Sequence, residues 1–311
     1  MTVPATTAAV VVAWNSGDSL ARAVASLVEA GITPGRIVVV DNASRDGAVG
    51  GAEADHPGLV VLRNPVNAGF GAAANQGATA ALDGGADQVL FLNDDAWFPP
   101  GELSRLCAVL ESNPRLGLVG PRVLLPGDPP RVWAAGGLRG GGPNLSTLRG
   151  HGRPDGPAFE ESVGVDYLPG CALLVTRAAW EDLGGFEESY FAYMEDVELG
   201  VRAHAAGWQP LCVGQSRCFH EASSSTGGGY TARRKYMNAL NGVHFLRSHG
   251  RPGEWVRFAL LDVLALPLVW LIGLLSGRGR AVTAKGLGIW HGLIGRRMSP
   301  ELLEPGGTAL W

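Results

Sequence analysis

The chain has 311 residues, 46% of them hydrophobic, and carries a formal charge of −4 at neutral pH. Its length fits one large or two modest domains, and this composition can bury a core without disulfides or structural metals. The small negative net charge gives the protein surface no overall positive potential, so we expect no nucleic acid partner. An anionic ligand would need a local site that provides positive charge or N–H donors. The cysteines form no C-x-x-C pair, which argues against a zinc or redox motif and is typical of buried thiols in a reducing compartment.

Short apolar runs alternate with helical patterns in the first part of the chain. The apolar runs cover 8–14, 36–42, 59–64 and 88–95, and the helical patterns cover Ser19–Ala30 and Gly71–Leu82. Continuous apolar runs separated by helices predict an α/β fold, with a mostly parallel sheet flanked by helices on both faces. In such sheets ligands bind beyond the carboxyl ends of the strands.

Polar residues follow three of these runs, where each strand is expected to end. Asn15 follows the first run, Asp41 and Asn42 the second, and Asn93, Asp94 and Asp95 the fourth. Because the carboxyl ends of parallel strands share one edge of a sheet, we expect these side chains to form one site.

The alternation continues further along the chain before the composition changes. We expect a helix at Gly101–Ser112, a strand at Leu116–Val123 and then a mobile Gly/Pro-rich loop at Pro126–Pro157. A strand and a short helix are expected within 165–186, followed by a helix closed by Gly207. A last strand at Gln209–His220 and a flexible flap at Ser223–Gly229 complete this part of the chain. The expected division is an α/β domain at residues 1–229 and a C-terminal helical extension at residues 230–311.

The extension contains an apolar run at Phe258–Leu275, interrupted by Asp262 and Pro267 and flanked by basic residues. The run is at the lower edge of the roughly 17–25 residues that span a bilayer. Since an aspartate in mid-bilayer would cost about 2.5–3.5 kcal/mol, the pattern favours a helix pair lying at a membrane surface. The alternative is an ordinary buried helix packed on the main domain or on a second subunit.

Two adjacent carboxylates, Asp94 and Asp95, end the run LFLNDD. Strand alternation sends only one of them into the site. Mg²⁺ at phosphates takes one or two carboxylates and waters, so Asp95 is the predicted metal ligand, and Asp94 is expected to contact the bound molecule. The alternative is a turn in which the aspartates bond to their own backbone.

A second acidic cluster, MEDVEL, opens a helix whose N-terminal end stabilises ionised carboxylates. Asp196 in this cluster could act as a general base towards a hydroxyl, although acidic residues are common at helix starts in any case. His220 ends the last predicted strand and could supply a neutral imidazole to the same metal. A structural histidine is the alternative.

A strand-to-helix turn within 64–77 carries Asn67, Gly69, Gly71 and Asn75. Small residues there let backbone N–H groups approach a phosphate or ribose, and a helix N-terminus favours anions. The glycine spacing matches neither a Rossmann dinucleotide site nor a P-loop.

Taken in order, these segments resemble a known family. The motifs VVVAWNS, VVVDNAS, N-x-G-F-G, FLNDDA and YFAYMEDVELGVRAHAAGW, followed by a histidine, extend over about residues 8–220. They are similar to family 2 glycosyltransferases with the GT-A fold, especially the rhamnosyltransferase-like and galactofuranosyltransferase-like branch. Each motif alone is weak, but five linked motifs are specific.

The resemblance implies roles for individual residues. Asn15 and Asp41 match residues that hold the base and ribose of a UDP- or dTDP-sugar, and Asn67, Gly69 and Phe70 match the loop that closes the nucleotide pocket. Asp95 matches the last position of the DXD metal motif, and His220 is similar to a histidine that completes the metal shell in some members. Asp196 matches the general base that deprotonates the acceptor hydroxyl. Asn93 stands where the motif has its first aspartate, so the ion, Mg²⁺ or Mn²⁺, has one fewer possible carboxylate.

The implied reaction is an inverting transfer of a sugar, with rhamnose favoured, from a nucleotide-diphospho-sugar to a glycan or lipid-linked acceptor of the cell envelope. A sugar-phosphate nucleotidyltransferase is disfavoured, because the sequence after Trp14 lacks a glycine- and Arg/Lys-rich loop. A non-catalytic, membrane-associated sugar-nucleotide-binding protein is the other alternative. We expect a peripheral protein on the cytoplasmic face of the plasma membrane, and a homodimer stays open.

Overall fold

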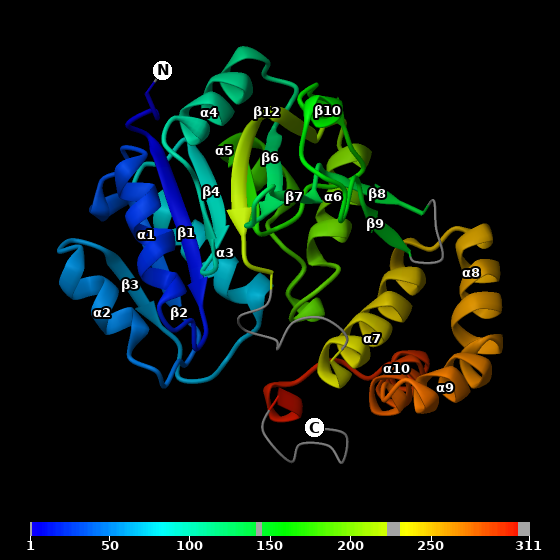
Figure 1. Ribbon diagram of the computed structural model, residues 1–311. Helices are drawn as coiled ribbons and strands as arrows, with labels where there is room; N and C mark the ends of the chain where they lie inside the picture. Colours follow the sequence, from blue (N-terminus) through cyan, green and yellow to red (C-terminus); the bar gives the residue numbers. More distant parts are fainter. Residues whose placement is uncertain (1, 141–144, 223–230, 304–311) are drawn as a thin grey trace.

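The computed structural model describes residues 2–140, 145–222 and 231–303, and its central feature is one twisted sheet flanked by helices (Figure 1). The strands are β1 (Thr7–Ala13), β2 (Ile37–Asp41), β3 (Val60–Arg63), β4 (Gln88–Asn93), β5 (Ala96–Trp97), β6 (Leu118–Leu125), β7 (Arg131–Ala134), β8 (Gly137–Arg139), β9 (Ser146–Leu148), β10 (Val163–Gly164), β11 (Ala172–Thr176) and β12 (Leu211–His220). The α-helices are α1 (Ser19–Glu29), α2 (Ala48–Asp55), α3 (Phe70–Asp83), α4 (Glu102–Ser112), α5 (Arg177–Leu183), α6 (Glu195–Ala205), α7 (Ala232–His249), α8 (Pro252–Phe258), α9 (Leu266–Leu275) and α10 (Gly279–Leu293).

The main sheet follows the order β10-β12-β6-β11-β4-β1-β2-β3, with β5 paired to β12 and β7 to β6. Strands β4, β1, β2 and β3 run parallel, and β11 is antiparallel to β4 and β6. In register, Ala13 lies beside Asp41, and Val12 lies beside Asn93. The carboxyl ends of three strands therefore meet at one edge, as the sequence pattern predicts.

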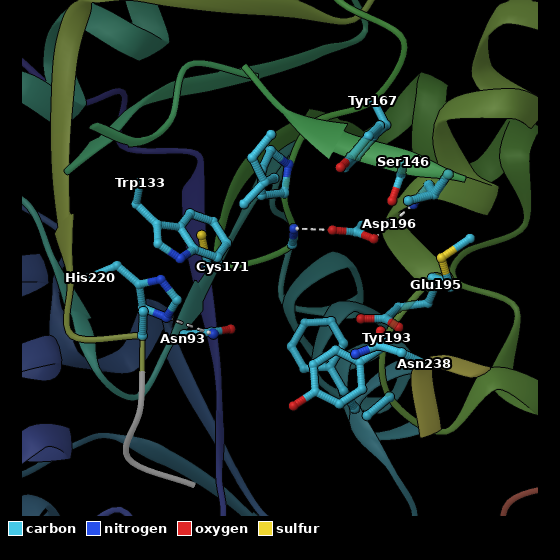
Figure 2. A pocket seen from close by; sticks show the side chains of 18 of the residues that line it. Asn93, Trp133, Ser146, Tyr167, Cys171, Tyr193, Glu195, Asp196, His220 and Asn238 are labelled. Carbon is cyan, nitrogen blue, oxygen red and sulfur yellow. Dashed lines mark hydrogen bonds between the residues drawn. The ribbon is translucent and has the colours of Figure 1, made fainter. Parts of the chain in front are cut away.

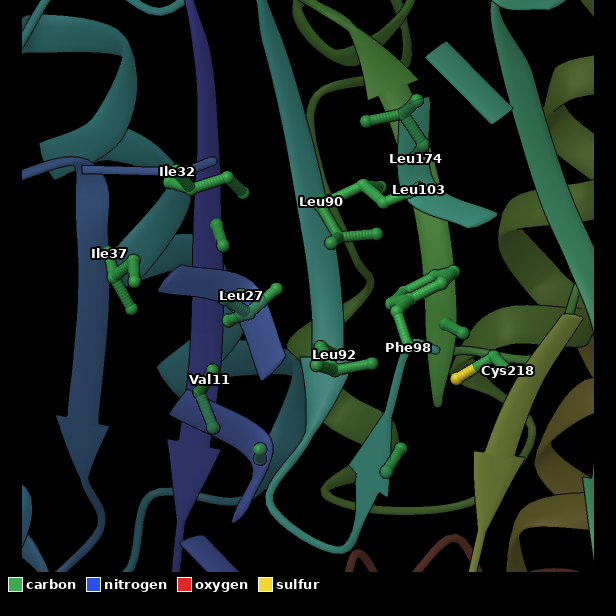
Figure 3. Close-up of a cluster of buried hydrophobic side chains, with 14 of the residues drawn as sticks. Val11, Leu27, Ile32, Ile37, Leu90, Leu92, Phe98, Leu103, Leu174 and Cys218 are labelled. Atoms are coloured by element: carbon green, nitrogen blue, oxygen red, sulfur yellow. The ribbon is translucent and has the colours of Figure 1, made fainter. Parts of the chain in front are cut away.

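Both faces of the sheet are buried. Helices α1 and α4 cover one face, where Val11, Leu27, Leu90 and Leu103 belong to one cluster of buried side chains (Figure 3). Helices α3, α5 and α6 contribute to the cluster on the other face. Burial on both faces explains why the central strands read as unbroken apolar runs. The four cysteines are free and buried, as expected.

One segment differs from its sequence-based prediction. Residues 126–157 were expected to form a mobile loop, but they contain β7, β8 and β9. Strand β7 pairs with β6, and β8 pairs with β9. These strands are only three or four residues long and lie among glycines, so no local periodicity marks them, and their pairing decides their conformation. The flap expected at 223–229 lies outside the described residues.

The C-terminal helices pack beside the sheet (Figure 1). The Arg139 guanidinium lies 2.8 Å from the Glu254 carboxylate, with both side chains 9% exposed, and it also lies over the Phe245 ring at 5.0 Å. Phe245 shares a buried cluster with Tyr167 and Tyr190 of the α/β domain. Helix α7 is therefore part of the same core as the site described below.

The apolar run of the extension forms a broken helix. A π-helical turn at 259–264 joins α8 to α9, and Pro267 stands in the first turn of α9, where its missing N–H costs no helical hydrogen bond. Within the described ranges no single helix is long and apolar enough to cross a membrane, but Pro252–Leu264 and Leu266–Leu275, bent by 42°, meet those criteria as a pair.

Candidate active site

Asp95 and His220 are brought together by strand pairing. Strand β5 follows Asp95 directly, and its pairing with β12 sets Ala96 opposite His220. His220 Nε2 lies 3.0 Å from Asp95 Oδ1 and 3.4 Å from the amide nitrogen of Asn93, and the Trp133 ring packs edge-on against the imidazole at 4.7 Å. A buried carboxylate and a buried imidazole thus share one point at the carboxyl edge of the sheet.

These residues supply an incomplete set of metal ligands. Among the residues that the structure describes, no group of three or more His, Cys, Asp or Glu side chains is placed to hold an ion. Asp95 and His220 could provide two ligand atoms, and His220 Nδ1 is buried without a hydrogen-bond partner among the residues that the structure describes. Mg²⁺ commonly binds through one or two carboxylates together with substrate phosphates and water. The pair therefore fits a divalent ion that the phosphates of a bound nucleotide help to hold.

Asp94 takes a different place from the one expected. It accepts hydrogen bonds from the Ser16 hydroxyl and from the backbone N–H of Trp14 at 3.5 Å, and it lines neither of the two cavities described below. Burial raises its pKa to about 6, against the lowering effect of the Ser16 hydrogen bond. Asp94 thus fastens the loop after β1, and it lies with Asp95 in the turn between β4 and β5 and not within a strand, so the turn and not strand alternation separates the two side chains.

Glu195 and Asp196 begin helix α6. Asp196 accepts backbone hydrogen bonds from Val197 at 2.8 Å and from Gly170 at 3.3 Å, while Glu195 Oε2 is buried and has no hydrogen-bond partner in the described part of the chain. Burial raises the pKa of both carboxyls, and the charge of Asp196 raises that of Glu195 further. The arrangement favours a protonated Glu195 beside an ionised Asp196.

The loop that presents these acids is strained and is held by the C-terminal extension. Phe191, Tyr193 and Met194 have φ angles of 62°, 71° and 77°, values that non-glycine residues rarely adopt. The buried amide of Asn241, on α7, donates to the carbonyls of Tyr190, Ala192 and Tyr193 at 2.7–2.9 Å. Asn241 was not predicted as a site residue. A buried polar residue within an apolar helical pattern is the sequence signal that could have identified it.

One cavity of about 340 Å³ joins Asp95 and His220 to Glu195 and Asp196. His220 and Asn93 lie on one side of it, and Asp196 and Glu195 lie on the other (Figure 2). Phe70 also lines this cavity. A molecule lying across it can contact Asp95 and His220 at one end and the carboxylate of Asp196 at the other.

A second cavity, of about 780 Å³, contains the residues predicted to hold the nucleotide. Asn15, Asp41 and Asn67 all line it. The Asp41 side chain accepts a hydrogen bond from the Ser44 N–H at 2.8 Å, and the Asn15 side chain accepts one from the Arg45 N–H at 2.9 Å. These hydrogen bonds fix the loops that surround the cavity. The structure also brings three arginines to this cavity that no motif had indicated, namely Arg45, Arg63 and Arg233.

The loop after β3 is organised by Asn42, which is 2% exposed. Its amide donates to Asn67 Oδ1 at 2.8 Å, and its own oxygen accepts from the Ala68 N–H at 2.9 Å. Gly69 has φ +87°, and a Cβ there would lie 2.6 Å from the Phe191 carbonyl oxygen. Only glycine fits at this close approach, so the glycine of the N-x-G-F-G motif lets the loop after β3 pack against the strained acidic loop.

Asn75 does not lie at the predicted position in the nucleotide site. Its side chain exchanges two hydrogen bonds of 2.9 Å with the backbone of Phe186 and donates a third to Glu188. It lines neither cavity. Asn75 therefore ties α3 to the loop after α5. Asn75 lies one helical turn beyond the expected phosphate site, and residue spacing alone could not show that its side chain bonds to the loop after α5.

The mostly parallel sheet flanked by helices is the GT-A fold, which solved structures of glycosyltransferases share. Residues 8–181 match the model of Glycosyl transferase family 2, and the chain belongs to that family. It is 33% identical over 240 residues to N-acetylglucosaminyl-diphospho-decaprenol L-rhamnosyltransferase of Mycobacterium tuberculosis, a match that covers 70% of this chain and 76% of that protein. The resemblance to the rhamnosyltransferase-like branch is thereby confirmed.

Solved structures share the fold at low sequence identity. A mannosyltransferase of Pyrobaculum calidifontis, in complex with GDP-Man and Mn²⁺, matches with a TM-score of 0.57 at 15% identity over 94% of this chain and 89% of that one. GalNAc-T7 with UDP, GalNAc and Mn²⁺ matches with a TM-score of 0.57 at 16% identity, over 79% of this chain but only 51% of that chain. At these identities the likeness concerns the fold alone.

Proposed function

We propose that this protein is an inverting, metal-dependent glycosyltransferase that moves a hexose, with rhamnose from dTDP-rhamnose favoured, onto a hydroxyl of a lipid-linked cell-envelope acceptor. The observation that carries the proposal is the single cavity with Asp95 and His220 on one side and Asp196 on the other. For the nucleotide of the donor, the proposal relies on Asn15, Asp41 and Asn67, which line the second cavity. The preference for rhamnose and for a lipid-linked acceptor comes from the name of the mycobacterial relative.

The residues suit a single displacement. Asp196 would take the proton of the acceptor hydroxyl as that oxygen attacks the anomeric carbon, and the nucleoside diphosphate would leave on the opposite side, so the configuration inverts. No carboxylate needs to form a covalent sugar ester, unlike in retaining hydrolases. Mg²⁺ or Mn²⁺ held by Asp95, His220 and the diphosphate would supply positive charge to the leaving group.

Release of nucleotide tests this function. Wild-type protein should release UDP or dTDP slowly from a matching sugar donor when Mg²⁺ or Mn²⁺ is present, and faster when an acceptor is added. The measurement is a coupled nucleotide-diphosphate assay over a panel of UDP-, dTDP- and GDP-sugars. A donor that raises the melting temperature without any turnover would instead favour a binding protein that lacks catalysis.

We further propose a peripheral position on the cytoplasmic face of a membrane, and the surface of the extension supports the contact with a membrane. Large apolar side chains are exposed along the broken helix, including Leu264 at 70%, Leu268 at 63% and Leu275 at 91%. Soluble surfaces rarely expose apolar residues in one contiguous patch. Arg251 and Arg280 stand near the two ends of this stretch, as in helices that lie on anionic lipid.

We expect the full-length chain to float with vesicles that contain anionic lipid. Replacing Leu264 and Leu268 with glutamate should lower the bound fraction several-fold, because both side chains would enter the lipid. Val66→Glu is the matched control, since Val66 is 59% exposed on the α/β domain, and it should float like wild type. If wild type stays with the soluble fraction, the patch is not a membrane contact.

A further inference from the structure

A buried carboxyl group beside Asp196 faces the active-site cavity without a partner. Glu195 is 8% exposed and lines the cavity, and its Oε2 makes no hydrogen bond within the described ranges. Asn238 of α7 brings a side-chain amide to the same cavity. Because buried polar groups are normally hydrogen-bonded, an unpartnered carboxyl that lines a cavity indicates a ligand that supplies the missing bond.

The contact that holds the acidic loop also places Asn238. Asn241 donates hydrogen bonds to three carbonyls of the loop that precedes Glu195, so this face of α7 packs against the loop. Asn238 stands three residues before Asn241 and therefore on the same face of the helix. Figure 2 shows Asn238 and Glu195 on the side of the cavity where Asp196 lies. A molecule bound at Asp196 can thus reach both groups.

The two groups have the same hydrogen-bonding character. Burial, and after it the charge of Asp196, raises the pKa of Glu195, so its carboxyl keeps a proton and can both donate and accept. The Asn238 amide also donates and accepts. A hydroxyl group offers one donor and two acceptor lone pairs. A neutral carboxyl and an amide on one side of the cavity therefore suit a hydroxyl better than they suit an ion.

We propose that Glu195 and Asn238 bind a second hydroxyl of the acceptor, next on the sugar ring to the hydroxyl that Asp196 deprotonates. The site would then select acceptors that carry a vicinal diol, and the bound hydroxyl would orient its neighbour towards the base. This inference rests on the proposed function, because that function places the attacking hydroxyl at Asp196. Glu195 and Asn238 act by binding and positioning, and only Asp196 takes a proton.

Transfer to octyl glycosides of N-acetylglucosamine, the sugar in the name of the mycobacterial relative, tests the subsite. The panel contains the parent glycoside and its three monodeoxy forms, and the acceptor KM is measured with a saturating donor. With wild type, the form that lacks the attacking hydroxyl should not react. A form that lacks the adjacent hydroxyl should have a KM raised by about 10-fold, the loss common when a buried partner is left unpaired.

Losses from removing the side chain and from removing the hydroxyl should not add. Asn238→Ala and Glu195→Ala should each raise the KM of the parent glycoside by about 10-fold, with little further rise for the adjacent deoxy form. Glu195→Gln should restore the wild-type KM, because its neutral amide also donates and accepts. Ser248→Ala, at an exposed position of the same helix away from the cavity, is the matched control and should behave like wild type.

Three results would overturn the subsite. Additive losses for every deoxy form would show that neither side chain binds a ring hydroxyl. A KM in Glu195→Gln as high as in Glu195→Ala would show that Glu195 acts as a charged group. A non-additive result with Ser146→Ala in place of Asn238→Ala would put the second hydroxyl at β9, where Ser146 lines the cavity and is hydrogen-bonded to Tyr167.

A binding measurement separates this inference from the proposed function. Saturation-transfer NMR of the same glycosides, with UDP or dTDP and Mg²⁺ present, compares wild type and variants without turnover. Weaker binding of the parent glycoside by the two alanine variants, in a wild type that transfers no sugar, would contradict the proposed function and keep the subsite. Equal binding by wild type and both alanine variants would overturn the subsite, whether or not sugar is transferred.

Discussion

Replacing Asp196 with asparagine should lower the rate of sugar transfer by about 10²–10⁴, because the variant keeps the shape of the side chain but cannot accept the hydroxyl proton. Donor affinity should hardly change, since Asp196 lies across the cavity from His220 and Asn93. The measurement is kcat with a saturating donor, alongside donor binding by calorimetry. Helix α6 should persist, because asparagine is tolerated at helix starts and Glu195 and Glu198 remain in its first turn.

The pH dependence gives a second readout for Asp196. Burial holds its pKa above the ordinary range for aspartate, and a general base works only when ionised, so the rate should fall with decreasing pH already in weakly acidic solution. Glu195→Gln is the matched control. Because Glu195 is expected to be protonated, this variant should retain most activity. Near wild-type transfer by Asp196→Asn, with loss in Glu195→Gln, would assign the base to Glu195 instead.

The second large effect concerns Asp95. Asp95→Asn should weaken donor binding in Mg²⁺ or Mn²⁺ by at least about 10–100-fold, the loss usual for groups that support a bound metal, and the rate should fall with it. The reason is that Asp95 is the carboxylate beside His220 at the end of the sheet. Donor calorimetry with metal and with EDTA measures the effect.

Two comparisons make the Asp95 experiment specific. Asn93→Asp introduces the aspartate that the DXD motif has at its first position. This variant should keep its activity or bind the metal more tightly. The arginines beside the nucleotide cavity, Arg45, Arg63 and Arg233, offer another way to match the charge of the diphosphate. If wild type binds its donor equally well in EDTA and in Mg²⁺, these arginines and not a metal carry that role.

The fold could be predicted because its signals are local. Unbroken apolar runs separated by helical patterns indicated the parallel sheet, and the predicted helix at Ser19–Ala30 agrees with α1 within one residue. The polar residues at strand ends, Asn15, Asp41 and Asp95, indicated the edge at which the site lies. Short strands such as β7 carry no such period and depend on long-range pairing, so the segment that contains them resembled a loop.

Tertiary structure decided which polar residues reach the site and which only support it. Asp94 and Asn75 belong to the same motifs as Asp95 and Asn67, yet their side chains bond to neighbouring loops. Asn241 holds the acidic loop from a helix far along the chain, and Lys235 and Lys285 share a cavity with Ser146 only because α7 and α10 pack beside β9. A sequence specifies residue types and local periods, but the direction of each side chain and its distant neighbours follow from packing, which no single motif contains.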